Sequence, residues 1–387
     1  MKKFLCIFAA AVLLIQAQPK PFLDAVCADK PSVSAKAAVL ISADTGEIIY
    51  EMNSSLKLPM ASTTKIMTTL LCIESGNLDE EFVVDSEAIK VEGSSMGLRE
   101  GDIVTKYALC CGMLLPSGND AANAAAVKLA GSIEAFAELM NERADEMGLS
   151  RTFFVTPSGL EGDGHGSSAY DMAILAREAL KNETFREICY QKSIQTEFGN
   201  PPYKRWLKNT NKLLSMYDGV YGVKTGFTDE AGRCLVSACE REGKNLICVT
   251  LNDKCDWDDH MALYNYGFEQ VKCITPNIPA LPYLDIAGAE NDKLALKMNE
   301  AEISITALDL KTDNLDYTII APPFIYAPIS AGDEAAQLRI SFNGREICSI
   351  PLYAAESAAI VKTETSKNDN NINIFKKIIK KLGKLFS

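Results

Sequence analysis

Residues 59–67, Pro59-Met60-Ala61-Ser62-Thr63-Thr64-Lys65-Ile66-Met67, open the segment that decides the architecture of this chain. Apolar residues recur from Ile66 to Ile73, and the segment stops at Ser75-Gly76-Asn77. This pattern predicts a buried helix that begins close to Ser62 and ends at a glycine. A serine and a lysine three residues apart lie on one helix face, so we expect Ser62 Oγ and Lys65 Nζ to lie together near the positive N-terminal end.

The scarcity of histidine favours a lysine as the base for a serine nucleophile. Only His165 and His260 are present, which makes a histidine-based triad a poor expectation. An unprotonated lysine can accept the proton of a serine hydroxyl. The spacing alone is a weak signal, because Ser54-Ser55-Leu56-Lys57 repeats it just before Leu58-Pro59, where a helix is disfavoured.

Two further motifs support the Ser62–Lys65 pair. Ser117-Gly118-Asn119 follows an apolar stretch and precedes a helical segment, a position from which a hydroxyl and an amide can enter a cleft. Lys224-Thr225-Gly226 is expected to close a strand, where Gly226 permits close approach of a ligand to the backbone. Ser75-Gly76-Asn77 copies the second motif, but its position indicates a helix stop. The three motifs in this order indicate a single site.

Strand signals on both sides of a helical region predict one antiparallel sheet within residues 29–275. Asp44-Thr45-Gly46 is a hairpin turn signal between the first two strands. The expected strands are 37–42, 47–51, 219–224, 233–240 and 246–252, and the expected helices lie within 106–147 and from 167 to 180. The predicted fold class is α/β, an antiparallel sheet flanked by helices. Prolines and short alternating strands after Ile274 predict a small all-β domain over residues 276–360.

The two termini predict export and membrane contact. Lys2 and Lys3 precede a mostly apolar run and small residues near Ala28, so residues 1–28 are expected to be a secretory signal peptide. Residues 361–371 form a polar linker. In residues 372–387, apolar side chains and lysines segregate onto opposite halves of a helix, which suits an anionic membrane surface. The alternative for this last segment is a helix packed on its own domain.

Composition excludes several classes of partner. The net charge of −12 argues against nucleic acid, which requires clustered Lys and Arg. No CxxC pair exists and only two histidines are available, so neither a metal site nor another cofactor is expected. The cysteines are scattered through apolar stretches and are expected to be buried thiols rather than a disulfide framework.

The three motifs SxxK, SxN and KTG together resemble the signature of penicillin-binding proteins and serine β-lactamases. Residues 61–67, 115–122 and 222–228 look more specifically like low-molecular-mass penicillin-binding proteins, the serine-type D-alanyl-D-alanine carboxypeptidases. The resemblance covers about residues 35–275, the β-domain more weakly, and the cationic tail. It implies a β-lactamase/transpeptidase-like fold, peptidoglycan stem peptides ending in D-Ala-D-Ala as substrates, and β-lactams as covalent inhibitors.

The resemblance also implies roles for individual residues. Ser62 would attack the penultimate D-Ala carbonyl and Lys65 would accept its proton, with burial and the Lys224 charge lowering the pKa of Lys65. Ser117 would relay a proton to the leaving group. The substrate-binding residues would be Asn119 for the peptide amide, Lys224 and Thr225 for the carboxylate, Gly226 for close approach, and Phe227, whose N–H would form the oxyanion hole with that of Ser62.

Two other functions remain open at this point. A class A-like β-lactamase would need a glutamate to activate water after the second motif, and Glu161 is the only acidic candidate near that place. A non-catalytic peptidoglycan-binding or antibiotic-sensing protein is disfavoured by three intact motifs. Some family members also bind the carboxylate with an arginine after the strand at 246–252, whereas this chain has the acidic run Asp256-Trp257-Asp258-Asp259 there. Part of carboxylate recognition therefore has no residue assigned to it.

Overall fold

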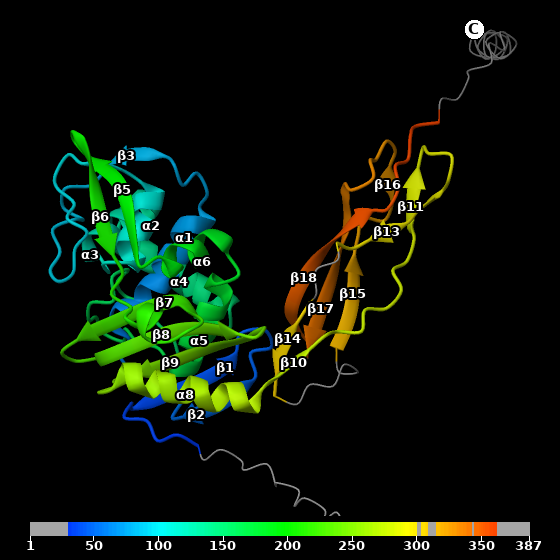
Figure 1. Cartoon of the computed structure of the whole chain (residues 1–387). Coiled ribbons are helices and arrows are strands. Elements are labelled where there is room, and N and C mark those ends of the chain that lie inside the picture. The colour runs from blue at the N-terminus through cyan, green and yellow to red at the C-terminus, as the bar shows by residue number, and fades with distance from the viewer. Residues whose placement is uncertain (1–29, 300–302, 309–314, 343, 362–387) are drawn as a thin grey trace, which may run out of the picture.

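The computed structural model describes residues 30–299, 303–308, 315–342 and 344–361 (Figure 1). The expected signal peptide, all but the first residue of the linker, and the amphipathic tail lie outside these ranges. None of the helices in the described ranges has the length and apolar character needed to cross a bilayer.

A five-stranded antiparallel sheet forms the centre of the first part of the chain, with the strand order β2-β1-β9-β8-β7. Its strands are β1 (Ala37–Ser42), β2 (Ile48–Met52), β7 (Val220–Thr228), β8 (Gly232–Arg241) and β9 (Lys244–Leu251). The N-terminal hairpin is thus joined edge to edge with three strands from much later in the chain. This order leaves β7 at an edge, where half of its backbone groups have no partner strand.

Helices cover both faces of this sheet (Figure 1). They are η1 (Ala61–Thr64, a single tight turn), α1 (Lys65–Glu74), α2 (Lys106–Leu114), α3 (Asn119–Ala130), α4 (Ile133–Glu146), α5 (Ala169–Ala179), α6 (Glu183–Tyr190), α7 (Leu213–Met216) and α8 (Asp256–Gln270). Alternate strand residues face opposite sides, so Val39 packs in the core with α1 to α6, whereas Leu40 packs in a second core with α8. The three sequence motifs lie where the larger helical layer meets the edge strand β7.

Two small hairpins flank the helical layer and were not predicted. They are β3 (Glu81–Val83) with β4 (Ile103–Thr105), and β5 (Ser193–Gly199) with β6 (Pro202–Lys208). The second hairpin stands over one end of the site described below.

Strands alone, most of them short, build the described residues of the last part of the chain. They are β10 (Lys272–Ile274), β11 (Leu284–Ala287), β12 (Lys293–Leu294), β13 (Leu296–Lys297), β14 (Ile305–Ala307), β15 (Leu315–Ile320), β16 (Ile325–Tyr326), β17 (Glu334–Phe342) and β18 (Arg345–Ala354). Their apolar residues form cores of their own, one around Leu338, Ile340 and Leu352 and a smaller one around Ile286 and Leu294. The expected fold class, an antiparallel sheet flanked by helices and followed by a β-domain, is confirmed.

Candidate active site

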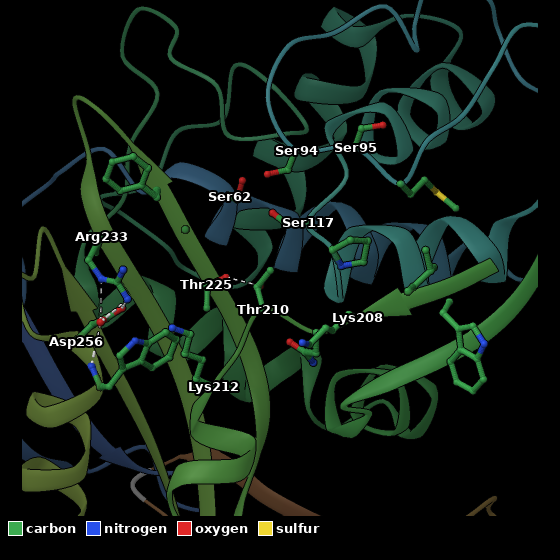
Figure 2. Close-up of a pocket in the computed structure, with 18 residues that line it drawn as sticks. Ser62, Ser94, Ser95, Ser117, Lys208, Thr210, Lys212, Thr225, Arg233 and Asp256 are labelled. Atoms are coloured by element: carbon green, nitrogen blue, oxygen red, sulfur yellow. Dashed lines mark hydrogen bonds and ion pairs between the residues drawn. The ribbon is translucent and has the colours of Figure 1, made fainter.

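A cleft of about 860 Å³ lies between β7 and the helical layer (Figure 2). Five of the residues singled out from the sequence line it: Ser62, Ser117, Thr225, Gly226 and Phe227. The other three, Lys65, Asn119 and Lys224, are buried beside it. The structure thus brings the three motifs together, although they are far apart in the chain.

Ser62 and Lys65 occupy the turn expected for them. Ser62 lies in η1 and Lys65 is the first residue of α1, so the two side chains, three residues apart, lie on one side of this helical segment. Lys65 Nζ donates to Ser62 Oγ at 2.9 Å, to Asn119 Oδ1 at 2.7 Å and to the carbonyl of Ser158 at 2.6 Å. None of these three partners of Lys65 is a carboxylate.

The surroundings of Lys65 favour its neutral form. Its side chain is fully buried, and burial together with the positive charge of Lys224 lowers the pKa of Lys65 well below its usual value. Neutral lysine keeps a lone pair and can act as a base toward the adjacent hydroxyl.

Ser117 and Lys224 form a second hydroxyl–amine pair. Ser117 follows α2 with a φ of 66°, in the left-handed region that a residue with a side chain rarely adopts. Lys224 Nζ donates to Ser117 Oγ at 2.9 Å and to the carbonyl of Thr225 at 2.7 Å. Burial lowers the pKa of Lys224 to about 7. This lysine therefore changes charge close to neutral pH.

The buried side chain of Asn119 links Lys65 to the backbone of Glu92. Its Oδ1 accepts from Lys65, and its Nδ2 donates to the carbonyl of Glu92 at 2.7 Å. Both ends of the amide are therefore engaged by the protein itself.

Gly226 brings β7 against the N-terminal end of η1. A Cβ atom at this position would lie 3.0 Å from the carbonyl oxygen of Met60 and 3.1 Å from the backbone nitrogen of Ser62. Only glycine permits this approach without a shift of the backbone. The strand continues two residues past Gly226, to Thr228, so the third motif lies within β7 and does not end it.

Several residues of the cleft were missed by sequence reasoning. Asp120 is 2% exposed and accepts hydrogen bonds from the N–H groups of Met96, Gly97 and Leu98 and from Ser95 Oγ. It thereby fixes the loop whose residues Ser94 to Met96 form one wall. An acidic residue directly after Ser117-Gly118-Asn119 was the available signal.

Another part of the wall comes from β6 and the residues that follow it. Trp206, Lys208, Thr210 and Lys212 line the cleft, and the hydroxyls of Thr210 and Thr225 lie 2.7 Å apart. Arg233, the cross-strand partner of Phe227, also lines the cleft, as does Asp256, to which Arg233 donates (Figure 2). No short motif marks these residues.

His165 supports the turn that carries Ser62. Its Nδ1 accepts from the N–H of Val155 at 2.9 Å, and its Nε2 lies 3.0 Å from Thr64 Oγ1. Burial, and secondly the charge of Lys57, lowers the pKa of His165 to about 4, so the ring is neutral at pH 7. A positioning role fits this geometry.

The sequence profile described as D-alanyl-D-alanine carboxypeptidase matches residues 24–255. The chain belongs to this family. It is 31% identical over 370 residues to the D-alanyl-D-alanine carboxypeptidase DacF of Bacillus subtilis, covering 92% of this chain and 94% of that protein. The carboxypeptidase DacC of Escherichia coli is also 31% identical, over 367 residues and 90% of each chain.

Solved structures of D-alanyl-D-alanine peptidases agree with this family assignment. A DD-transpeptidase from Streptomyces aligns at 32% identity with a TM-score of 0.60, covering 62% of this chain and 99% of that one. The carboxypeptidase DacD of Francisella tularensis covers 89% of this chain and 97% of its own, at 28% identity and a TM-score of 0.59. The expected family, fold and serine-type carboxypeptidase activity are thereby confirmed.

The described residues of this carboxypeptidase contain no group of three or more His, Cys, Asp or Glu side chains placed to hold a metal ion. The chemistry that the cleft can perform with its own side chains is proton transfer and nucleophilic attack by a serine.

Proposed function

We propose that the enzyme removes the terminal D-alanine from peptidoglycan stem pentapeptides through an acyl-enzyme on Ser62. Lys65 accepts the Ser62 proton as Oγ attacks the penultimate D-Ala carbonyl. The observation that carries this assignment is the 2.9 Å contact of a fully buried lysine, shifted toward its neutral form, with a serine hydroxyl at the cleft surface.

The remaining motif residues have distinct proposed roles. Ser117 passes a proton to the departing D-Ala, supported by its contact with Lys224 Nζ. The N–H groups of Ser62 and Phe227 bind the oxyanion, supported by the close approach of Gly226 to the Ser62 nitrogen. Asn119 holds Lys65 in place as well as contacting the peptide amide, and Lys224 with Thr225 binds the terminal carboxylate.

The geometry supports this reading over a β-lactamase. Glu161 is exposed and lines a separate cavity of only about 20 Å³, together with Ala61, Gly159 and His165. Lys65 Nζ contacts an amide, a hydroxyl and a carbonyl. No glutamate takes part in these contacts, so the water-activating arrangement of a class A enzyme has no support here.

We further propose that the enzyme works outside the cytoplasm, exported by residues 1–28 and held on the outer face of the cytoplasmic membrane by residues 372–387. The support is the sequence pattern of the two termini. Residues 29–275 and 276–360 are proposed as the peptidase and β-domains, joined near β10, which pairs with β14.

Intact-protein mass spectrometry after mixing with penicillin tests the nucleophile. A long-lived adduct is expected on the wild-type enzyme and on Ser54→Ala, the matched decoy serine, but not on Ser62→Ala. A diacyl tripeptide ending in D-Ala-D-Ala should instead be turned over with release of one D-alanine, because the departing amino acid leaves room for water.

The outcomes separate the three functions. Rapid lactam hydrolysis without an accumulating adduct would favour a β-lactamase. Adduct formation without peptide turnover would favour an antibiotic sensor. An adduct that persists in Ser62→Ala would overturn the assignment of the nucleophile.

A further inference from the structure

To bind the free carboxylate of a substrate, the end of the cleft near Thr225 needs a side chain that stays positively charged at neutral pH. Lys224 alone supplies only part of the interaction with a carboxylate, because its Nζ is buried and already donates to Ser117 and to the carbonyl of Thr225. Burial also lowers the pKa of Lys224 to about 7, so it is only partly cationic near neutral pH. A further positive group is required if this end of the cleft is to select for a carboxylate.

Arg233 lies at the appropriate place in the sheet. It is the direct cross-strand partner of Phe227, and Leu235 is the partner of Thr225. Side chains directly opposed on antiparallel strands share a face, and diagonal neighbours lie within reach of a long side chain. Arg233 and Thr225 are such diagonal neighbours, and both line the cleft.

The guanidinium of Arg233 is held by the first turn of α8. Its Nε and Nη2 donate to the carboxylate of Asp256 at 2.7 to 3.0 Å. The Asp256 side chain is 3% exposed, whereas that of Arg233 is 43% exposed. The Trp257 ring lies 5.3 Å from Arg233 Cζ and adds a second support. One edge of the guanidinium is therefore buried against Asp256 while the rest of the group is open to the cleft.

Donors remain on Arg233 for a ligand. None of the hydrogen bonds found among the described residues uses Nη1, which carries two N–H groups. A guanidinium stays charged at every working pH and matches the geometry of a carboxylate.

We infer that Arg233 is a specificity-determining residue that binds the free C-terminal carboxylate of the substrate, and that Asp256 is its positioning residue. This inference rests on the proposed carboxypeptidase reaction at Ser62. In the sequence, the acidic run at residues 256–259 stands where some family members have the arginine that binds the carboxylate. That contact is assigned to Arg233 instead. Lys208, the last residue of β6, and Lys212, the residue before α7, also line the cleft, but neither lies on a strand that pairs with β7 and neither opposes Phe227 as Arg233 does.

The test compares two substrates that differ only at the C-terminus, an N-acylated peptide ending in D-Ala-D-Ala and the same peptide as its C-terminal amide. Wild-type enzyme should prefer the free acid. Arg233→Gln should lower kcat/KM for the acid by about 10- to 100-fold, the range for one charge-assisted contact, and change it for the amide by less than about threefold.

Stability controls accompany this comparison, because Arg233→Gln leaves a buried carboxylate unpaired. The double variant Arg233→Gln with Asp256→Asn removes that charge and should show the same loss of acid preference. Asp256→Asn alone should reduce the preference less than loss of the arginine. Arg186→Ala, which breaks an exposed ion pair with Glu240 outside the cleft, should leave the acid-to-amide ratio unchanged.

An acid-to-amide ratio that is unchanged in Arg233→Gln would overturn the inference, and an equal loss of kcat/KM on both substrates would show that Arg233 has only a structural role. An acid-to-amide ratio that responds to Lys212→Ala and not to Arg233→Gln would assign the carboxylate contact to Lys212 and overturn the inference. Failure of the proposed reaction is distinguishable, because wild-type enzyme would then cleave neither peptide.

Discussion

The Oδ1 atom of Asn119 accepts a hydrogen bond of 2.7 Å from Lys65 Nζ, although 54 positions separate the two residues in the chain. The second motif therefore helps to hold Lys65, the lysine of the first motif, in place. Lys65 Nζ lies within hydrogen-bond distance of three oxygen atoms, and none of them belongs to a carboxylate.

Lys65→Arg should reduce turnover by about 100- to 10,000-fold, the usual contribution of a general base, although charge and length are nearly kept. The reason is that a guanidinium cannot accept a proton at any working pH. Release of D-alanine is the measurement. Lys57→Arg, in the decoy SxxK sequence, is the matched control and should retain activity. Comparable activity of both variants would exclude Lys65 as the proton acceptor.

The pH dependence of kcat/KM should be bell-shaped, with its falling limb near pH 7. Lys65 must be neutral, so activity rises as pH rises through its lowered pKa. Lys224 must be cationic to hold a carboxylate, so activity falls as pH rises through its pKa of about 7. Steady-state rates from about pH 5 to about pH 10 provide the test, because this range lies roughly between the pKa of an ordinary carboxyl group and that of an ordinary lysine.

The variant Lys224→Arg tests whether Lys224 causes the falling limb of the pH profile. Whatever activity this variant retains should lose the falling limb, since arginine does not titrate in this range. A wild-type profile that still rises steadily at pH 9, about two units above the Lys224 pKa, would contradict the proposed role of Lys224.

Asp120→Asn should raise KM more than it lowers kcat. Asparagine places an NH₂ group where backbone N–H groups now point, so the loop from Ser95 to Leu98 loses part of its anchor. Leaving such buried donors unsatisfied costs about 1 to 3 kcal/mol, which urea unfolding can measure. Asp145→Asn, an exposed change on α4, serves as the control. If KM is unchanged while stability falls, the loop contributes nothing to substrate binding.

Removal of residues 372–387 should abolish binding to anionic vesicles and leave catalytic activity intact. Each lysine near an anionic surface contributes about 1 kcal/mol, so binding of the full chain should weaken with added salt. Cosedimentation with anionic and with neutral vesicles measures both effects. Equal partitioning of the full-length and shortened proteins would refute a membrane role for this segment.

Much of the first motif could be predicted because it depends on local geometry. Ser62 and Lys65 are three residues apart at the start of one helix, and helical periodicity alone places such side chains together. The apolar run at 37–41 and the turn at Gly46 likewise predicted the first hairpin, which the structure contains as β1 and β2. The hairpin of β5 and β6 escaped notice because its strands are largely exposed and carry little apolar alternation.

The sequence by itself determined which residue types could perform the chemistry, through three motifs in a set order, and it determined the family. Only the tertiary structure decided which partners surround them: Asn119 on Lys65, Ser117 on Lys224, and Asp256 on Arg233. These contacts depend on the register of β7 with β8 and on how α3 and α8 pack against the sheet. Register and packing are set by burial of side chains distant in the chain, so no local pattern reports them.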